Sequence, residues 1–186
     1  MARLSYPDPT QLSDTTQQIL GRLPVLLHLF HMLAYAQSAL APTLLLGKAI
    51  LGDLELPDRL RELAILQVAR AAQADYEWVQ HVSIARVAGI PNEQIALVEQ
   101  GDIEASVFDP RERLALHVAR EVVAGPSISD ETFAVLQAHF SPREIVELLL
   151  SISYYLMLGR IMTTLQVDLD PPSGMAVVQV ARQDVL

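Results

Sequence analysis

Residues 61–70 read RELAILQVAR, residues 75–81 read DYEWVQH, and residues 84–90 read IARVAGI. Apolar residues in these stretches recur three and four positions apart, which is the spacing of one face of an α-helix. Few residues separate the first stretch from the second, so the connection between them must be short. The pattern therefore predicts two consecutive helices, Asp58–Ala72 and Tyr76–Ala88, joined by a turn.

The same periodicity continues on both sides of this pair, and no stretch alternates as a strand would. Glycine and proline fall mainly between the periodic segments, where they end helices. We therefore predict an all-α helical bundle of seven to eight helices. The remaining helices are expected at Asp14–Leu23, Val25–Leu51, Asn92–Gln100, Pro110–Ala124, Asp130–Phe140 and Pro142–Gln166.

Two helix starts carry a complete local signal. Asp109 and Ser141 are each followed by proline at the first helical position and by glutamate at the third. This arrangement is typical of a capping box with proline at the first turn. Gly89, Gly101 and Gly125 each follow an apolar helical run and can close a helix in the left-handed conformation.

The length of 186 residues fits a single domain, spanning 1–186, with one substantial core. Residues 1–13 are expected to form an N-terminal arm. The tail 170–186 contains Pro171, Pro172 and Gly174, so we expect it to be extended, laid over a neighbouring subunit. The chain is 51% hydrophobic and 19% charged, an apolar surplus that favours a homo-oligomer.

Charge and cysteine content exclude several classes of function. The formal net charge is −9, and no cluster of Lys and Arg is present to bind nucleic acid. There are no cysteines, so disulfides, iron–sulfur clusters and thiol nucleophiles are excluded. The N-terminus lacks the apolar core of a secretory signal, which predicts a cytoplasmic location. The uncharged stretch Leu23–Gly47 is interrupted by polar residues, which favours a helix buried in an oligomer over a membrane span.

Glu77 and His81 are the residues whose spacing first indicates chemistry. Four positions apart on one helix, they share a face, so a carboxylate could orient an imidazole or exchange a proton with it. Two alternatives are an ordinary solvated pair and, for Glu62 on the preceding helix, a salt bridge with Arg59 or Arg70. The sequence pattern by itself favours these structural roles.

The order of these residues resembles the core motif of the carboxymuconolactone decarboxylase family: Glu62, then Tyr76-Glu77-Trp78, then His81, then residues 84–89 reading IARVAG. The similarity extends over about Leu29 to Gly101, and more weakly to the final helix around residues 154–157. The resemblance implies the AhpD-like fold of the alkylhydroperoxidase D superfamily. It also implies a homo-oligomer, commonly a dimer, trimer or hexamer.

In the alkylhydroperoxidase D branch, the motif contains a glutamate, two cysteines separated by two residues, and a histidine that relays protons to the redox disulfide. By this resemblance Glu62 occupies the glutamate position, while Ala74 and Glu77 occupy the cysteine positions. Without thiols the motif has no reductant for a peroxide and cannot form the redox disulfide, so peroxidase activity is not expected. The decarboxylase branch acts on a small carboxylated lactone with no cofactor.

These considerations predict a cofactor-independent lyase or isomerase that acts on a small carboxylated or lactone-type metabolite. His81 would be the acid or base, with Glu62 or Glu77 setting its tautomer. Tyr76, His31 and Tyr154 are candidates for substrate binding. The nearby cations that could hold an anionic substrate are Arg59, Arg61, Arg70 and Arg86.

Two alternatives of other classes remain open. A non-catalytic ligand-binding or scaffold oligomer would keep the fold after losing the thiols, and it would leave the Glu and His side chains diverging or in solvent. A metal site could use Glu62, Glu77 and His81 as ligands. We predict no metal, because the paired Glu-x-x-His repeats of di-iron bundles are missing.

Overall fold

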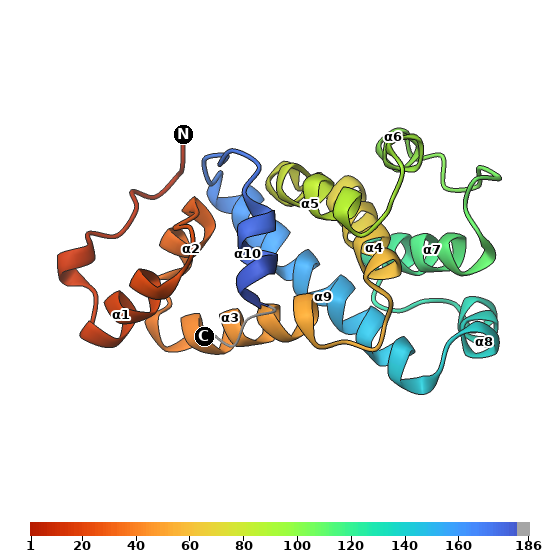
Figure 1. The fold of residues 1–186 in the computed structure, drawn as a ribbon, viewed down its shortest axis with the longest axis horizontal. Coiled ribbons are helices and arrows are strands. Elements are labelled where there is room, and N and C mark those ends of the chain that lie inside the picture. The colour runs from red at the N-terminus through yellow and green to blue at the C-terminus, as the bar shows by residue number, and fades with distance from the viewer. Residues whose placement is uncertain (182–186) are drawn as a thin grey trace.

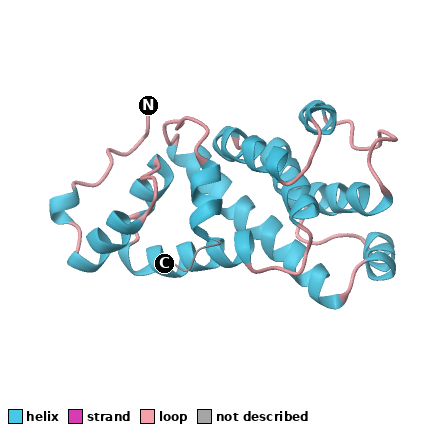
Figure 2. Ribbon diagram, in the orientation of Figure 1, coloured by secondary structure: helices cyan, strands magenta, loops and turns pink. Residues whose placement is uncertain are grey.

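The computed structural model describes residues 1–181, and every regular element within that range is helical (Figure 2). The predicted all-α fold is confirmed. The structure has a 3₁₀ helix, η1, at Pro9–Gln11. The α-helices are α1 Asp14–Arg22, α2 His28–Leu33, α3 Gln37–Gly52, α4 Asp58–Ala71, α5 Asp75–Val87, α6 Asn92–Gln100, α7 Pro110–Ala124, α8 Asp130–His139, α9 Pro142–Leu165 and α10 Gly174–Ala181.

The predicted helix Val25–Leu51 is divided in the structure. Helix α2 ends before Ala34, and α3 begins at Gln37 and continues through Pro42. No glycine or proline marks the break. Contacts with the N-terminal segment lie at this point: the Tyr35 hydroxyl donates to the Ser5 carbonyl, and the Gln37 side chain accepts from the Ser13 backbone. Tertiary contacts therefore accompany a break that the local sequence does not signal.

The C-terminal tail is a second correction. We expected it to be extended from Asp170, but α10 forms at Gly174–Ala181 and packs against α3 and α5 of the same chain. In Figure 1, α10 lies between these two helices. Val178 of α10 forms a small apolar cluster with Leu51 and Ile84, and Met175 packs against it. Residues 182–186 of the predicted tail lie outside the described residues.

Helix ends follow their local signals closely. Both predicted capping boxes are present, at Asp109 and Ser141. Gly89 and Gly101 adopt positive φ angles, of 85° and 80°, where a side chain would be strained. Gly125 does not, because its backbone is extended.

Helix α4 lies at the centre of the bundle, against α5, α7 and α9 (Figure 1). All of its residues from Leu60 to Ala69 are buried, including the charged Arg61 and Glu62. Burial of an entire helix surface is typical of a core element. Its charged residues must therefore be paired inside the protein, because an isolated buried charge is very costly.

Among the described helices, α9 is long and apolar enough to cross a membrane by length and composition, and 56% of its most apolar stretch is buried inside the protein. This is weak evidence for a membrane span. Val146, Leu150 and Met157 of α9 are large apolar residues that stay exposed. The expected homo-oligomer would cover such a surface, but self-association stays a prediction.

The predicted N-terminal arm, residues 1–13, contains η1 and lies along the end of α9. The Arg3 backbone donates to the Leu165 carbonyl, and the Tyr6 hydroxyl donates to the Asp168 carboxylate at 3.1 Å. The Tyr6 ring stacks on the rings of His28 and His31. The N-terminal segment thus packs against α2 and against the end of α9.

Candidate active site

A mainly apolar cavity of about 90 Å³ lies among α2, α3, α5 and α9, with Gly174 of α10 at its margin. Leucine, isoleucine, phenylalanine and methionine side chains form most of its wall. The polar groups come chiefly from one face of α5, which contributes Tyr76, Glu77, Gln80 and His81. An apolar cavity with a few convergent polar groups is the usual form of a small-molecule site.

His81 is held in this wall by Glu62, which reaches it from α4. The Nδ1 atom of His81 lies 2.8 Å from Oε2 of Glu62, and both side chains are buried. Since the carboxylate accepts the hydrogen bond, it favours the tautomer that carries its proton on Nδ1. The Nε2 atom has no hydrogen-bond partner among the described residues. It is the nitrogen that can act on a ligand as a base.

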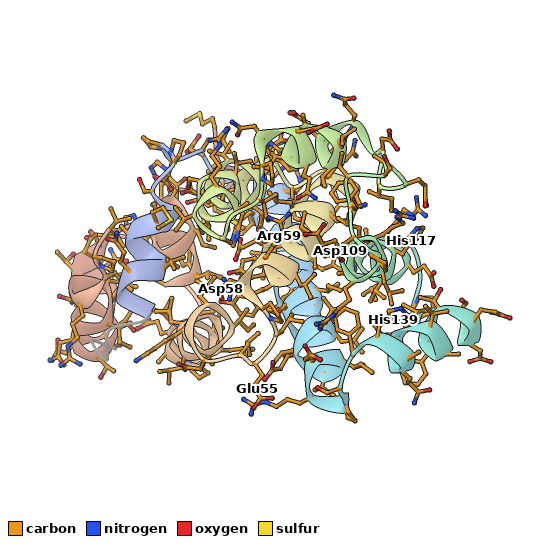
Figure 3. All side chains as sticks on the ribbon, turned by 45° about the vertical axis from the view of Figure 1, so that its right-hand side comes forward. Glu55, Asp58, Arg59, Asp109, His117 and His139 are labelled. Carbon is orange, nitrogen blue, oxygen red and sulfur yellow. The ribbon has the colours of Figure 1, made fainter. Side chains whose placement is uncertain are left out.

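Arg61 balances the charge of Glu62 inside the core. Its Nε donates to Oε1 of Glu62 at 3.0 Å, and its Nη1 donates to the Asp58 carboxylate at 2.6 Å. Asp58 lies at the beginning of α4 (Figure 3). The expected pairing of Glu62 with Arg59 or Arg70 is wrong, because both of these arginines bind other residues. The partner of Glu62 is Arg61, which is 1% exposed.

Glu77 contributes a second carboxyl group, which differs from that of Glu62 in its hydrogen bonding and protonation. It is buried, and neither of its carboxyl oxygens has a hydrogen-bond partner. Burial raises the pKa of Glu77 to about 8, so the carboxyl is mainly protonated at neutral pH. The interpretation of Glu77 and His81 as a solvated pair is therefore wrong, and the carboxylate that orients His81 is Glu62.

Two adjacent tyrosines of α9 line the cavity, and they differ in their hydrogen bonding. Tyr154 lines the cavity and donates to the Thr43 carbonyl at 3.1 Å. Tyr155 also lines the cavity, and its ring meets the His81 ring edge-on at a centroid distance of 4.5 Å. No described residue hydrogen-bonds to the Tyr155 hydroxyl. Our list of candidates omitted Tyr155. The adjacent tyrosines of α9 were the available signal, but their orientation depends on packing.

Tyr76 lines the cavity with its ring, while its hydroxyl donates to the Asp170 carboxylate. His31 is a correction, because it does not line the cavity. Its Nε2 lies 3.0 Å from the Pro7 carbonyl, against the N-terminal segment. His31 therefore contributes to packing of that segment.

Two glycines let helices approach each other around the cavity. A Cβ atom at Gly47 would lie 2.5 Å from the Tyr154 hydroxyl, and a Cβ at Gly159 would lie 2.9 Å from the Cβ of Ala74. Real Cβ atoms essentially never come so close. Glycine at these positions gives Tyr154 and Glu77 room to face the same cavity.

The segment Asp170–Ser173 is attached to the cavity wall through Gln80. The Gln80 amide donates to the carbonyls of Asp170 and Pro171, and its oxygen accepts from the Ser173 backbone at 2.8 Å. The Asp170 carboxylate also accepts from the His28 backbone at 2.7 Å. These bonds attach the start of α10 to the cavity wall.

Residues 37–121, from α3 to α7, match the model of the Carboxymuconolactone decarboxylase family. This match covers 85 of the 186 residues and includes Glu62, Glu77 and His81. The sequence has no cysteine, and Ala74 and Glu77 stand at the two cysteine positions that the resemblance assigns. No curated protein matches the sequence.

Solved structures show the AhpD-like fold over nearly the whole chain. An uncharacterized peroxidase-related protein from Ralstonia eutropha JMP134, with an alkylhydroperoxidase AhpD core, has a TM-score of 0.77 at 19% identity and covers 97% of this chain and 96% of its own. A peroxidase-related protein from Silicibacter sp. TM1040 gives 0.78 at 18% identity, covering 93% and 94%. The debrominase Bmp8, in a cysteine-to-alanine variant complexed with 2,3,4-tribromopyrrole, gives 0.70 at 17% identity, covering 100% and 96%.

None of the four arginines predicted to hold an anionic substrate lines the cavity. Arg59 binds Glu112, Arg61 binds Glu62, and Arg86 binds Asn92. Arg70 donates to the Glu99 carbonyl. Lys48 of α3 is the cationic side chain in the described lining. Within residues 1–181, no group of three or more His, Asp or Glu side chains has a metal-binding arrangement.

Proposed function

We propose that this protein is a cofactor-independent lyase or isomerase, similar to carboxymuconolactone decarboxylases, that acts by acid–base chemistry on a small carboxylated or lactone-type metabolite. The observation that carries the proposal is the buried Glu62–His81 hydrogen bond beside a cavity that Glu77 shares. A scaffold that had lost its chemistry would have no need of a buried carboxyl without partners, because such a group destabilises the fold.

His81 acts as the base in an isomerisation. Its Nε2 removes a proton from the carbon next to a carbonyl, and the electron pair of the C–H bond forms the enolate. Glu62 stabilises the resulting imidazolium through Nδ1, and Arg61 keeps Glu62 in place. Return of the proton from Nε2 to another carbon of the conjugated system completes the reaction.

Glu77 is the hydrogen-bond donor for the oxygen on which negative charge develops. A carboxylic acid kept neutral by an apolar site can stabilise an enolate in this way. In a decarboxylation, the carbon–carbon bond breaks, CO₂ leaves, and the electron pair forms the same enolate. The imidazolium form of His81 then protonates carbon, so both reactions use the same groups.

The test is proton exchange catalysed by the intact chain. Small ketones, lactones and carboxylated lactones are incubated in D₂O, and deuterium incorporation or CO₂ release is followed by NMR. We expect turnover of at least one compound, and a decrease of about 100-fold or more in His81→Ala. Equal rates for wild type and His81→Ala would contradict the proposal.

Glu112→Gln is the matched control for these measurements. Glu112 is buried and paired with Arg59, as Glu62 is with Arg61, but unlike Glu62 it has no bond to His81. Its substitution removes a comparable buried charge without touching the site. We expect its turnover to match the wild type under conditions where both are folded.

A further inference from the structure

The cavity contains two hydrogen-bond donors that the protein leaves without partners. Both carboxyl oxygens of Glu77 are buried and unpaired. No hydrogen bond from a described residue to the Tyr155 hydroxyl is found, although this oxygen is not among the fully buried unpaired atoms. Both side chains line the same cavity, Glu77 from α5 and Tyr155 from α9. Buried polar groups are normally satisfied, so the unpaired carboxyl of Glu77 indicates a ligand atom that accepts from it. Tyr155 in the same wall can donate to that same atom.

Burial keeps both groups in the donor form. It raises the pKa of Glu77 to about 8 and that of Tyr155 well above its ordinary value. At neutral pH each therefore has a proton to donate. The partner that satisfies them is an oxygen acceptor, and a carbonyl oxygen can accept two hydrogen bonds at once.

An anionic ligand fits this site poorly. The chain has a net charge of −9, and the arginines around the site are bound elsewhere. Behind His81, Glu62 and Asp58 share the single cation Arg61, so this group adds no positive charge to the site. The rest of the wall is mainly aliphatic and aromatic, with Lys48 of α3 as its one Lys or Arg side chain among the described residues. A carboxylate would therefore lose its hydration and gain at most one ammonium group and no guanidinium.

We propose that Glu77 and Tyr155 form an oxyanion-hole pair that takes the carbonyl oxygen of an uncharged, largely apolar enolisable ketone or lactone. This inference rests on the proposed function and narrows it to proton transfer on neutral carbonyl compounds. The apolar part of the ligand lies against Leu29, Phe30 and Leu44, and its acidic carbon faces His81. The hydrogen bonds strengthen as the carbonyl becomes an enolate.

Binding of three probes with one common ring tests the ligand class. Cyclohexanone, cyclohexanecarboxylate and cyclohexylamine differ only in their polar group, and their dissociation constants are measured with the full chain by NMR titration. At pH about 7 we expect the ketone to bind about tenfold or more tightly than either charged probe. Tighter binding of the carboxylate or the amine, or no binding of the ketone, would overturn the inference.

The pH dependence tests the donor role of Glu77. If the ketone needs the protonated carboxyl, raising pH from about 7 to about 9.5 weakens binding about 30-fold. The other titratable groups that face or support the cavity are Lys48 of α3, Glu62 and Arg61 of α4, Tyr76 and His81 of α5, Tyr154 and Tyr155 of α9, and Asp170 before α10. Glu77→Gln keeps an N–H donor, so we expect it to bind the ketone with little change over this pH range. A pH effect that persists in Glu77→Gln would assign it to another of these groups and overturn the inference.

Tyr155→Phe removes the second donor and keeps the ring against His81. We expect a loss of about 2- to 10-fold in ketone affinity, the effect of one neutral hydrogen bond. Unchanged affinity in both Tyr155→Phe and Glu77→Val would contradict the donor pair. The Tyr155→Phe arm remains informative if Glu77→Val does not fold.

The inference and the proposed function fail in different measurements. Ketone binding that depends on Glu77 but leads to no His81-dependent exchange would retain the ligand class and reject the enzyme. The opposite result is His81-dependent turnover of carboxylated lactones together with tighter binding of the carboxylate probe than of the ketone. It would support the proposed enzyme and reject the inferred ligand class.

Discussion

The His81 imidazole and the Glu62 carboxylate meet at 2.8 Å across the contact between α5 and α4, 19 positions apart in the chain. The bond is buried, and the opposite oxygen of Glu62 accepts from Arg61. Three side chains from two helices thus form one continuous polar connection inside an otherwise apolar core. It leaves Nε2 of His81 as the free edge of the ring.

Replacing Glu62 with Gln should weaken the hydrogen-bonded connection between Arg61 and His81. The amide keeps the volume of the carboxylate but loses the charge that stabilises the imidazolium, so turnover should fall about 100-fold. The imidazole Nδ1 proton should also lose its strongly hydrogen-bonded NMR resonance, which a merely structural role of Glu62 would not require. A Glu62→Gln variant that retains both the resonance and the rate would show that Glu62 does not position His81.

Glu77 should make the fold less stable as pH rises. Its folded pKa of about 8 lies above its ordinary value of 4.5. Between these values the folded protein keeps a proton that the unfolded chain releases. The contribution of Glu77 to the free energy of unfolding is therefore fully present below about pH 4.5. It is lost as pH rises towards 8, by roughly 1.4 kcal/mol per pH unit.

The measurement is denaturant unfolding of wild type and Glu77→Gln at several pH values from about 5 to about 8. We expect Glu77→Gln to gain stability over wild type progressively through that range. Glu112→Gln, which removes a paired carboxylate, should not remove the slope. If the free energy of unfolding depends on pH in the same way in wild type and Glu77→Gln, Glu77 is not held neutral by burial.

Much of the fold could be predicted from sequence because its signals are local. The first residues of α7 and α9 could be predicted from the N-caps Asp109 and Ser141 and from the proline and glutamate that follow each of them. Helix α10 was missed for the opposite reason. Pro171, Pro172 and Gly174 indicate a chain that has left helical structure, and α10 gains its apolar cover from α3 and α5, which are distant in sequence.

The sequence indicated that Glu62, Glu77 and His81 belong together, but it did not indicate which carboxylate bonds to His81. The spacing of Glu77 and His81 places them on one helix face, and they do share a cavity. Which carboxylate bonds to His81 depends on how α4 packs against α5, and no spacing within one helix contains that information. Tyr155 depends in the same way on the orientation of α9, and the loss of His31 from the site depends on the N-terminal segment.

Gly47→Ala should disturb the cavity wall. The new methyl group would lie 2.5 Å from the Tyr154 hydroxyl, which must move and lose its bond to the Thr43 carbonyl. We expect a loss of about 1–3 kcal/mol in the free energy of unfolding. Adding Tyr154→Phe should recover part of this loss, because it removes the clashing oxygen.

Gly21→Ala is the control for the glycine substitution. Gly21 also lies in a helix, α1, and nothing lies within 4 Å of its added Cβ. Alanine there should stabilise the protein by up to about 1 kcal/mol through helix propensity. If both alanine variants change stability equally, the contact between α3 and Tyr154 is not as close as the structure has it.

Gln80→Leu should release the segment 170–173 from the cavity wall. Gln80 makes three hydrogen bonds to the backbone of residues 170–173, and leucine keeps its volume and helix propensity but makes none. Helix α10 begins directly after this segment and is anchored by a small apolar cluster. We therefore expect faster amide hydrogen exchange in residues 174–181, with α7 as an internal reference that does not change. Uniformly faster exchange throughout the chain would mean that Gln80 supports the whole fold, and unchanged exchange would mean that the apolar cluster alone holds α10.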